Sequence, residues 1–191
     1  MISLQNKKLI LGSKSPRRKE LLSQISPNIE IRIQEVDEIY DEKLDVFKVP
    51  TYLAELKATA LTPNIQENEI IITADTIVIL ENEILGKPDS MEDAKKMLQK
   101  LSGKKHLVIT GCCLSDMNKQ KTFSVQTEVY FNVLTQEMID FYVDTYKPLD
   151  KAGSYGIQEW IGMVGIEKIN GSYYNVMGLP VAELWKELNE F

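Results

Sequence analysis

Cysteine and histidine are nearly absent from this 191-residue sequence, which holds two cysteines, the neighbours Cys112 and Cys113, and one histidine, His106. Adjacent cysteines in an apolar stretch are typical of buried, inert thiols and provide no disulfide framework. A structural zinc site would have at most three soft ligands, and a Ser-His-Asp triad would need His106. We expect neither kind of site.

Long hydrophobic runs and excess positive charge are also lacking. No apolar segment approaches the ~20 residues that span a bilayer, and the lysines near the N-terminus precede only a short apolar run, residues 9–11, which is no signal-peptide core. With 22 Lys and Arg against 28 Asp and Glu, the net charge of −6 disfavours general binding of nucleic acid. We therefore expect a cytoplasmic protein that binds neither membrane nor nucleic acid, with any anion site confined to one place.

The order of strand and helix signals predicts the fold class. Apolar runs or alternation predict strands over residues 8–12, 29–36, 69–85, 106–114, 121–134, 162–169 and 173–176, with turns at Glu81-Asn82, 115–120 and Asn170-Gly171. Helices are expected from Pro16, over 51–61, after Ser90, over 135–146 and from Pro180. Interleaved elements with several hairpins favour an α/β fold with a mixed sheet and flanking helices. No linker is evident, so residues 1–191 are predicted to form a single domain.

The first candidate site is the start of the helix at Pro16. Residues 13–19 carry four cations on an otherwise acidic protein, and the free N–H groups of a helix start already favour an anion. Arg17 and Arg18 offer planar forks for phosphate oxygens, and Ser13 offers a hydroxyl donor. The alternative is a solvated basic turn.

Two further charged residues stand in apolar surroundings. Asp75 interrupts a continuous apolar strand, where a carboxylate is costly unless a metal, a cation or a hydrogen bond compensates it. It is either a metal ligand or general base, or a turn-forming aspartate. Lys57 lies four residues after Leu53 in the apolar stripe of its helix, and it either points into a site or extends its ammonium group to solvent.

Weaker signals come from three other segments. Lys87 follows a hairpin strand, and the carboxylates of Glu35, Asp37 and Glu38 are of the kind that binds Mg²⁺, although such charge runs are more often solvated. Residues 150–158 combine small residues with Gln158, whose amide suits the edge of a nucleobase. A structural loop explains the same composition.

These residues together resemble the Maf family of nucleoside triphosphate pyrophosphatases. The resemblance covers nearly the whole chain and is carried by six motifs in the same order, at residues 13–22, Ala74-Asp75-Thr76, Gly86-Lys87-Pro88, Leu101-Ser102-Gly103, residues 150–158 and residues 175–180. It implies a fold like that of the inosine triphosphate pyrophosphatases, with two lobes around a deep cleft, often as a homodimer. It also implies hydrolysis of the bond between the α- and β-phosphates.

Site roles follow from the resemblance position by position. Ser13, Arg17 and Arg18 correspond to a triphosphate clamp, Lys57 and Lys87 to further phosphate contacts, and Asp75 to the catalytic carboxylate. Thr76 and Gln158 correspond to substrate-binding residues. Glu38 is our choice for a further carboxylate that, with Asp75, holds Mg²⁺ or Mn²⁺, and Asp37 is the next choice.

The same resemblance indicates the substrate. The loop at 150–158 is similar to that of the subgroup acting on dTTP and UTP, including modified uridine triphosphates. Glu159 departs from the family pattern, in which glycine usually follows the glutamine, and a carboxylate beside the base pocket would change its size and field. The alternative function is a regulatory module, linked to septum formation, that binds nucleotides without turnover. All these roles require the basic turn and Asp75 to lie close together.

Overall fold

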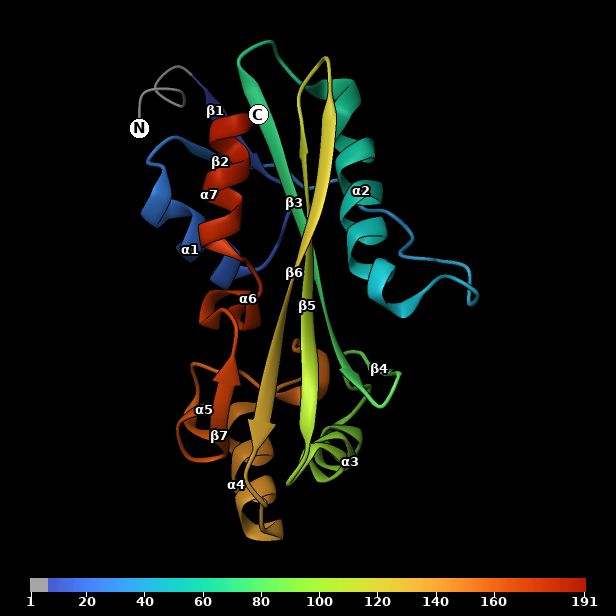
Figure 1. The fold of residues 1–191 in the computed structure, drawn as a ribbon, viewed down its shortest axis with the longest axis vertical. Helices are drawn as coiled ribbons and strands as arrows, with labels where there is room; N and C mark the ends of the chain where they lie inside the picture. Colours follow the sequence, from blue (N-terminus) through green and yellow to red (C-terminus); the bar gives the residue numbers. More distant parts are fainter. Residues whose placement is uncertain (1–6) are drawn as a thin grey trace. The chain divides into compact units, whose positions relative to one another are not determined.

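The computed structural model describes residues 7–191, drawn in sequence colours in Figure 1. Residues 1–6, on which the prediction of no signal peptide partly rests, lie outside this range. The strands are β1 Lys8–Leu11, β2 Ile29–Ile31, β3 Glu69–Leu80, β4 Glu83–Leu85, β5 Lys105–Ser115, β6 Gln120–Phe131 and β7 Ile166–Asn170. The α-helices are α1 Pro16–Ile25, α2 Val49–Leu61, α3 Met91–Leu101, α4 Gln136–Tyr146, α5 Trp160–Val164, α6 Tyr173–Met177 and α7 Val181–Glu190. Short 3-10 turns are η1 Val46–Lys48, η2 Thr62–Asn64 and η3 Ala152–Ser154.

The strands form one seven-stranded sheet in the order β2-β1-β3-β5-β6-β7, with β4 paired to β3. The β1 strand pairs in parallel with β2 and β3, whereas β3 with β4 and β6 with β7 are antiparallel. The predicted mixed α/β sheet with flanking helices is therefore confirmed.

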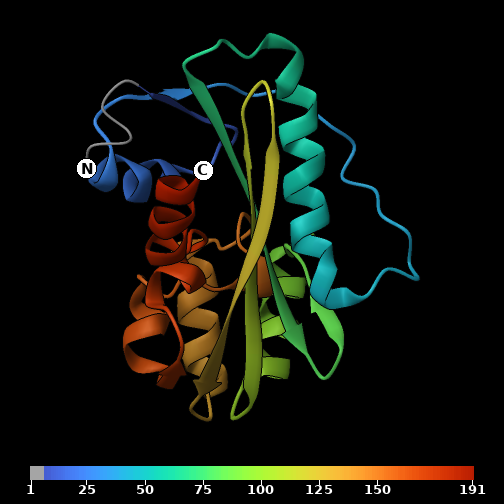
Figure 2. The same cartoon turned by 45° about the horizontal axis from the view of Figure 1, so that its top comes forward.

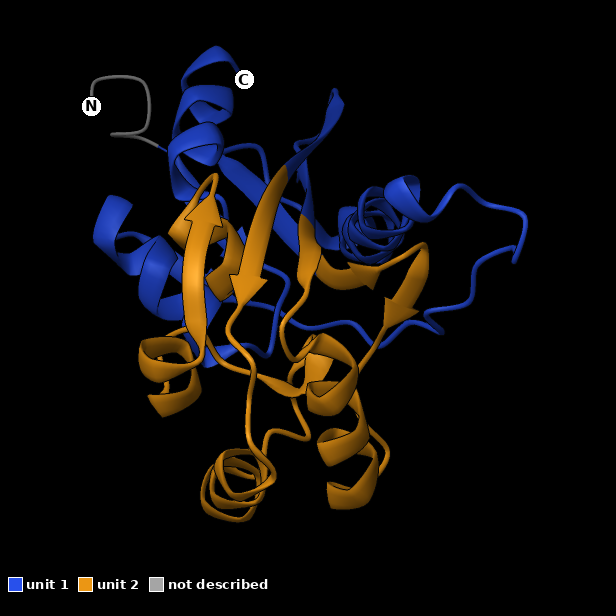
Figure 3. Ribbon diagram, turned by 60° about the horizontal axis from the view of Figure 1, so that its bottom comes forward, with its two compact units in different colours: residues 1–75, 110–125, 178–191 blue, residues 76–109, 126–177 orange. Residues whose placement is uncertain are grey.

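The chain divides into two compact units, each built from segments that are not consecutive in the sequence (Figure 3). Unit 1 comprises residues 1–75, 110–125 and 178–191, and unit 2 comprises residues 76–109 and 126–177. Each of the long strands β3, β5 and β6 is divided, with one part in unit 1 and the other in unit 2. A single domain with a cleft between two lobes stays a prediction.

In unit 1, α2 packs along β3 and β5, as Figure 2 shows. One face of the sheet buries Ile10, Ile71 and Cys113 against Ala54, Ala58 and Leu61 of α2. The β5 strand can approach the helix because Gly111 has no side chain. A Cβ there would lie 2.3 Å from the backbone of Pro50 and Thr51. The other two helices of the unit, α1 and α7, contact each other.

In unit 2, α3 contacts both α4 and the η3 turn, and α5 contacts β7. The β3 to β4 turn is formed by Glu81 and Asn82, both in the left-handed region with φ of 51° and 71°, as an Asn-containing hairpin turn requires. The helix after Ser90 begins as predicted, because the Ser90 hydroxyl accepts a hydrogen bond from the Asp93 N–H.

Three predicted strands differ from the structure, two in their bounds and one in its type. The strand predicted over 29–36 ends at Ile31, and Ile33 beyond it is exposed, so its alternation does not mark a buried face. The strand predicted over 173–176 is the helix α6, because the Ser172 hydroxyl accepts from the Asn175 N–H and caps a helical turn. The strand predicted over 162–169 starts only at Ile166, because Gly162 and Gly165 donate to Glu159 and Ile161 carbonyls in a helical turn.

Within residues 7–191, none of the helices combines the length and the apolar character that a membrane-spanning helix needs.

A buried ion-pair network joins β1, β2 and the start of β3. Glu69 is fully buried, and its two carboxylate oxygens accept from Nη1 and Nη2 of Arg32, both at 2.9 Å. The Gln66 N–H donates to the same carboxylate at 3.0 Å, and Lys8 lies 4.0 Å away. The hydrogen bonds from Arg32 hold the pKa of Glu69 below its usual value. This carboxylate therefore stabilises the fold in its ionised form.

We predict that Glu69→Gln lowers the free energy of unfolding at pH 7 by about 2 kcal/mol, because it weakens hydrogen bonds to a charged group and leaves Arg32 with Glu30 as its remaining counter-charge. Since the folded pKa of Glu69 is depressed, the wild-type advantage is complete above the unfolded pKa of about 4.3. It declines as the pH falls below that value. Urea denaturation at pH 7 and pH 4 measures both effects. Glu67→Gln, an exposed neighbour, is the control, and an equal loss at both pH values would contradict the prediction.

Candidate functional site

The basic turn before α1 is held by two serine hydroxyls. Ser15 caps the helix by accepting from the Arg18 N–H at 3.4 Å. Ser13 is buried, and its hydroxyl oxygen accepts from the Ser15 N–H and from Nη1 of Arg18, both at 3.2 Å. Because Ser13 accepts both bonds, its own proton can be donated to an anion at the helix start.

Arg18 connects this turn to the strand that carries Asp75. Its Nη1 donates to the Ala74 carbonyl at 2.8 Å, and its Nε donates to the Gly178 carbonyl at 2.8 Å. Burial lowers the pKa of Arg18 below its usual value, and the nearby Asp75 opposes this change in part. The guanidinium remains a cation. Arg18 therefore places a positive charge beside Asp75 and fixes two backbone segments there.

Lys57 on α2 joins two of the predicted carboxylates. Its ammonium nitrogen lies 2.6 Å from Oδ1 of Asp75 and 3.1 Å from Oε1 of Glu38. The side chains of Lys57 and Asp75 are only 16% and 14% exposed, whereas that of Glu38 is 50% exposed. The lysine ammonium is thus held between two carboxylates, and it is the compensation that Asp75 requires in an apolar strand. That Lys57 binds phosphate stays a prediction.

Packing of α2 on the sheet explains why Lys57 reaches Asp75. Thr73, two residues before Asp75 on β3, donates its buried hydroxyl to the Ala54 carbonyl at 2.6 Å. Ala54 lies three residues before Lys57, one helical turn away on the same face. The hydrogen bond therefore sets the height of α2 along β3 at the point where the ion pair forms.

The donor set fits a divalent cation that is shared with a substrate. Oxygens of Asp75 and Glu38 both lie within 3.1 Å of one nitrogen, so the two carboxylates face a common position. Within residues 7–191 no three His, Cys, Asp or Glu side chains are grouped so as to hold a metal by themselves. Mg²⁺ is commonly held by one or two carboxylates, water and substrate phosphates, and this pair of carboxylates matches that pattern.

Three predicted residues belong to unit 2. Thr76 follows Asp75 directly on β3 and is half-buried, while Lys87 is exposed just after β4. Gln158 is the single exposed residue between Lys151 and Trp160. The Gly153 N–H donates to the Gly86 carbonyl at 3.0 Å, so the 150–159 loop is tied to the segment that carries Lys87. That Lys87 and Gln158 share one site with Asp75 stays a prediction.

Arg17 and Asp37 complete the predicted set. Arg17 is half-buried in the first turn of α1, and Asp37 is exposed in the segment between β2 and η1. Their roles in phosphate and metal binding stay predictions.

The two cysteines are buried, as the sequence predicts, and so is His106, for which the sequence made no such prediction. Burial raises the pKa of Cys112 and of Cys113 to about 12, so both are inert thiols. His106 is buried with its Nε2 2.8 Å from the Tyr155 hydroxyl, and burial lowers its pKa to about 3. A neutral, enclosed imidazole of this kind has a structural role.

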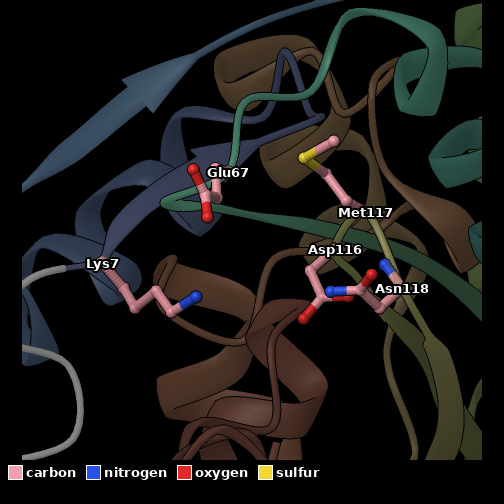
Figure 4. A pocket seen from close by; sticks show the side chains of 5 residues that line it. All are labelled: Lys7, Glu67, Asp116, Met117 and Asn118. Carbon is pink, nitrogen blue, oxygen red and sulfur yellow. The ribbon is translucent and has the colours of Figure 1, made fainter.

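A hollow of about 220 Å³ lies elsewhere in unit 1, near the turn between β5 and β6 (Figure 4). Its lining residues are Lys7, Glu67, Asp116, Met117 and Asn118. None of them was predicted as a site residue, and the Asp116 carboxylate accepts the Asn118 and Lys119 N–H groups of the turn. The hollow is therefore separate in composition from the candidate site.

Sequence reasoning missed the polar contacts around Glu159. Its carboxylate accepts from the Tyr142 hydroxyl and lies 3.1 Å from Nζ of Lys151. The carboxylate of Glu159 is thus bound by protein groups, and its effect on a base pocket stays a prediction. The sequence offered no signal for this pairing, because Tyr142 lies on another helix and its buried position depends on the tertiary fold.

Known proteins resemble this chain in sequence and in fold. The family model described as "Maf-like protein" matches residues 8–191. The chain is 51% identical over 189 residues to the dTTP/UTP pyrophosphatase of Phocaeicola vulgatus, with 98% of each chain covered. It is 48% identical to the enzyme of the same name from Parabacteroides distasonis, with 99% of this chain and 98% of that one covered. The Staphylococcus aureus Ham1 protein shares the fold, with a TM-score of 0.55, 17% identity, and 95% of this chain and 100% of that chain covered.

The ion pair at Lys57 generates a prediction about metal binding. In Lys57→Met, Asp75 and Glu38 lose the ammonium that competes with a divalent cation for their oxygens. We expect Mn²⁺, in the absence of nucleotide, to bind this variant about fivefold more tightly than the wild type, which corresponds to about 1 kcal/mol for an ion pair that water still reaches. Titration followed by Mn²⁺ electron paramagnetic resonance measures the affinity. Lys100→Met, which removes the exposed pair with Glu83, should leave it unchanged; weaker binding by Lys57→Met would refute the prediction.

Proposed function

Because this chain belongs to the Maf family, we propose that it is a nucleoside triphosphate pyrophosphatase that hydrolyses the α-β phosphate bond of dTTP and UTP. The products are the nucleoside monophosphate and pyrophosphate. The observation that carries the proposal is the convergence, within unit 1, of the Arg18 turn and the Lys57 ammonium on the strand position of Asp75. The named relatives, both dTTP/UTP pyrophosphatases, support the choice of substrate.

The cations of the site suit a triphosphate. Arg17, Arg18 and Lys57 give unit 1 a local positive charge on a protein of net charge −6, and Ser13 adds a hydroxyl donor. Positioning and charge stabilisation are the main demands of phosphoryl transfer, because charge develops on the departing pyrophosphate. Lys87 of unit 2 is proposed to add a further phosphate contact.

Asp75 is proposed to act as the base. The ion pair with Lys57 uses Oδ1, so Oδ2 is the oxygen that takes a proton from water. The water oxygen then bonds to the α-phosphorus as the bond to the bridging oxygen breaks and pyrophosphate leaves. Mg²⁺ or Mn²⁺, held by Asp75 and Glu38, would supply charge neutralisation between the phosphates when bound.

We also propose a location, an oligomeric state and a class of substrate for this protein. A cytoplasmic location suits a consumer of nucleoside triphosphates with two free, buried cysteines. A homodimer is proposed on the family resemblance alone. The acidic charge supports a small-molecule substrate over nucleic acid.

Product analysis tests the proposed reaction. The protein is mixed with dTTP and Mg²⁺, and we expect dTMP and pyrophosphate in equal amounts. Orthophosphate with dTDP would indicate an ordinary phosphohydrolase instead. No release of phosphate in any form, with nucleotide bound, would favour the regulatory module that binds without turnover.

The base assignment gives a separate prediction. Asp75→Asn removes the proton acceptor while keeping the shape of the side chain, so kcat should fall by at least about 10² with nucleotide affinity nearly intact. Steady-state kinetics and equilibrium binding of dTTP measure the two quantities. Glu55→Gln, an equivalent change at an exposed position of α2, is the control. A fully active Asp75→Asn enzyme would refute the role of Asp75.

A further inference from the structure

The 150–159 loop of unit 2 is closed by the carboxylate of Glu159. This carboxylate lies at the end of the loop, yet one of its oxygens is 3.1 Å from Nζ of Lys151 at the beginning. The Lys151 side chain is 9% exposed and also pairs with Asp150 at 2.8 Å. A buried ammonium is costly without counter-charges, so Lys151 binds the carboxylates of both ends of the loop.

Tyr142 on α4 makes a second closure. Its ring is fully buried and stacked on Tyr146, and its hydroxyl donates to Oε2 of Glu159. The same hydroxyl accepts from the Gly156 N–H at 2.9 Å. Burial and the nearby Glu159 raise the pKa of Tyr142, so the phenol stays a proton donor. One hydroxyl therefore links Gly156 and Glu159, the residues on either side of Ile157 and Gln158.

The loop backbone lies directly against the carboxylate. A Cβ on Gly156 would be 2.7 Å from Oε2 of Glu159, so the absence of a side chain at Gly156 lets the carboxylate reach Tyr142. Tyr155 and Ile157 are buried on either side of Gly156, whereas Gln158 is exposed. The backbone that carries Gln158 is thus held on both sides, and its side chain is the part of the loop that is presented outward.

We propose that Glu159, held by Tyr142 and Lys151, is a positioning residue that fixes the Gln158 amide for discrimination between pyrimidine and purine bases. This inference rests on the proposed function, because it concerns the base of the same nucleotide. Glu159 acts through the loop and does not touch the substrate. It explains why a carboxylate is tolerated next to a residue that reads a base, since both of its oxygens are bound by protein groups.

Two substitutions disturb the closure by different routes. Tyr142→Phe removes only the hydroxyl and keeps the ring that stacks on Tyr146. Glu159→Ala removes the carboxylate, and Glu159→Gln is the conservative variant, because its amide oxygen still accepts from Tyr142. The matched controls are Tyr174→Phe and Glu167→Gln, which make the same chemical changes at exposed positions of unit 2.

The readout is the ratio of kcat/KM for dTTP to that for dGTP. In Tyr142→Phe and Glu159→Ala we expect this ratio to fall about tenfold, the effect of losing one hydrogen bond to a charged group. The change should lie in KM for dTTP, while kcat for dTTP stays within about twofold of the wild type. Glu159→Gln should retain most of the discrimination. The double variant Tyr142→Phe with Glu159→Ala should lose less than the sum of the two single effects, because both substitutions remove the Tyr142–Glu159 hydrogen bond.

Hydrogen exchange gives a readout that needs no turnover. The peptide covering residues 150–160 should exchange about tenfold faster in Tyr142→Phe than in the wild type, because the Gly156 N–H loses its acceptor. The control Tyr174→Phe should match the wild type.

Several outcomes would overturn the proposal. If Glu159→Ala changes the dTTP to dGTP ratio but Tyr142→Phe does not, Glu159 acts on the base directly and not through the loop. If both variants lose the same activity towards dTTP and dGTP, the contacts are merely structural. If the wild type hydrolyses dTTP and neither variant changes the ratio, this inference fails and the proposed function stands. A wild type that hydrolyses no nucleoside triphosphate overturns both.

Discussion

The hydrogen bond from Thr73 to the Ala54 carbonyl is the constraint on which the candidate site depends. A register shift of α2 by one residue would turn Lys57 by about 100° around the helix axis and away from Asp75. The close approach of Gly111 to the backbone of Pro50 and Thr51 holds the same helix about one turn earlier, at its first residues. These two contacts set where the backbone of Lys57 lies along β3, and the ion pairs with Asp75 and Glu38 hold its ammonium group.

The Lys57 ammonium has carboxylate partners before any substrate binds. Lys57 pairs with the carboxylates of Asp75 and Glu38. Arg18 donates its Nε and Nη1 hydrogens to two backbone carbonyls. Under the proposed function, Lys57 would bind phosphate oxygens, and Asp75 and Glu38 would hold the divalent cation, which would supply charge neutralisation. These side chains would then keep partners of opposite charge, and an unpaired buried charge is the arrangement that proteins avoid.

Local signals in the sequence identified the elements whose ends are fixed by nearby residues. The Ser15-Pro16 start of α1 and the Ser90 cap of α3 were predicted because a cap lies within three residues of its partner. The composition of residues 173–176 favours a strand, whereas the contact of the Ser172 hydroxyl with the Asn175 N–H begins a helical turn that composition does not predict. Asp75 and Lys57 were identified because a charge in an apolar run has a cost that is visible without the fold, whereas their pairing depends on how α2 lies along β3.

The two ends of a nucleotide make different demands on a protein. Phosphates need charge at fixed positions, and in unit 1 it is supplied by helices and a strand that hydrogen bonds hold in place. A base needs a few directed hydrogen bonds, and in unit 2 the exposed amide of Gln158 sits in a loop whose shape depends on the side chains of Tyr142 and Glu159. Under the proposed function, one substitution in such a loop would alter which base is preferred, whereas the charges of unit 1 that are proposed to bind the phosphates would be unchanged.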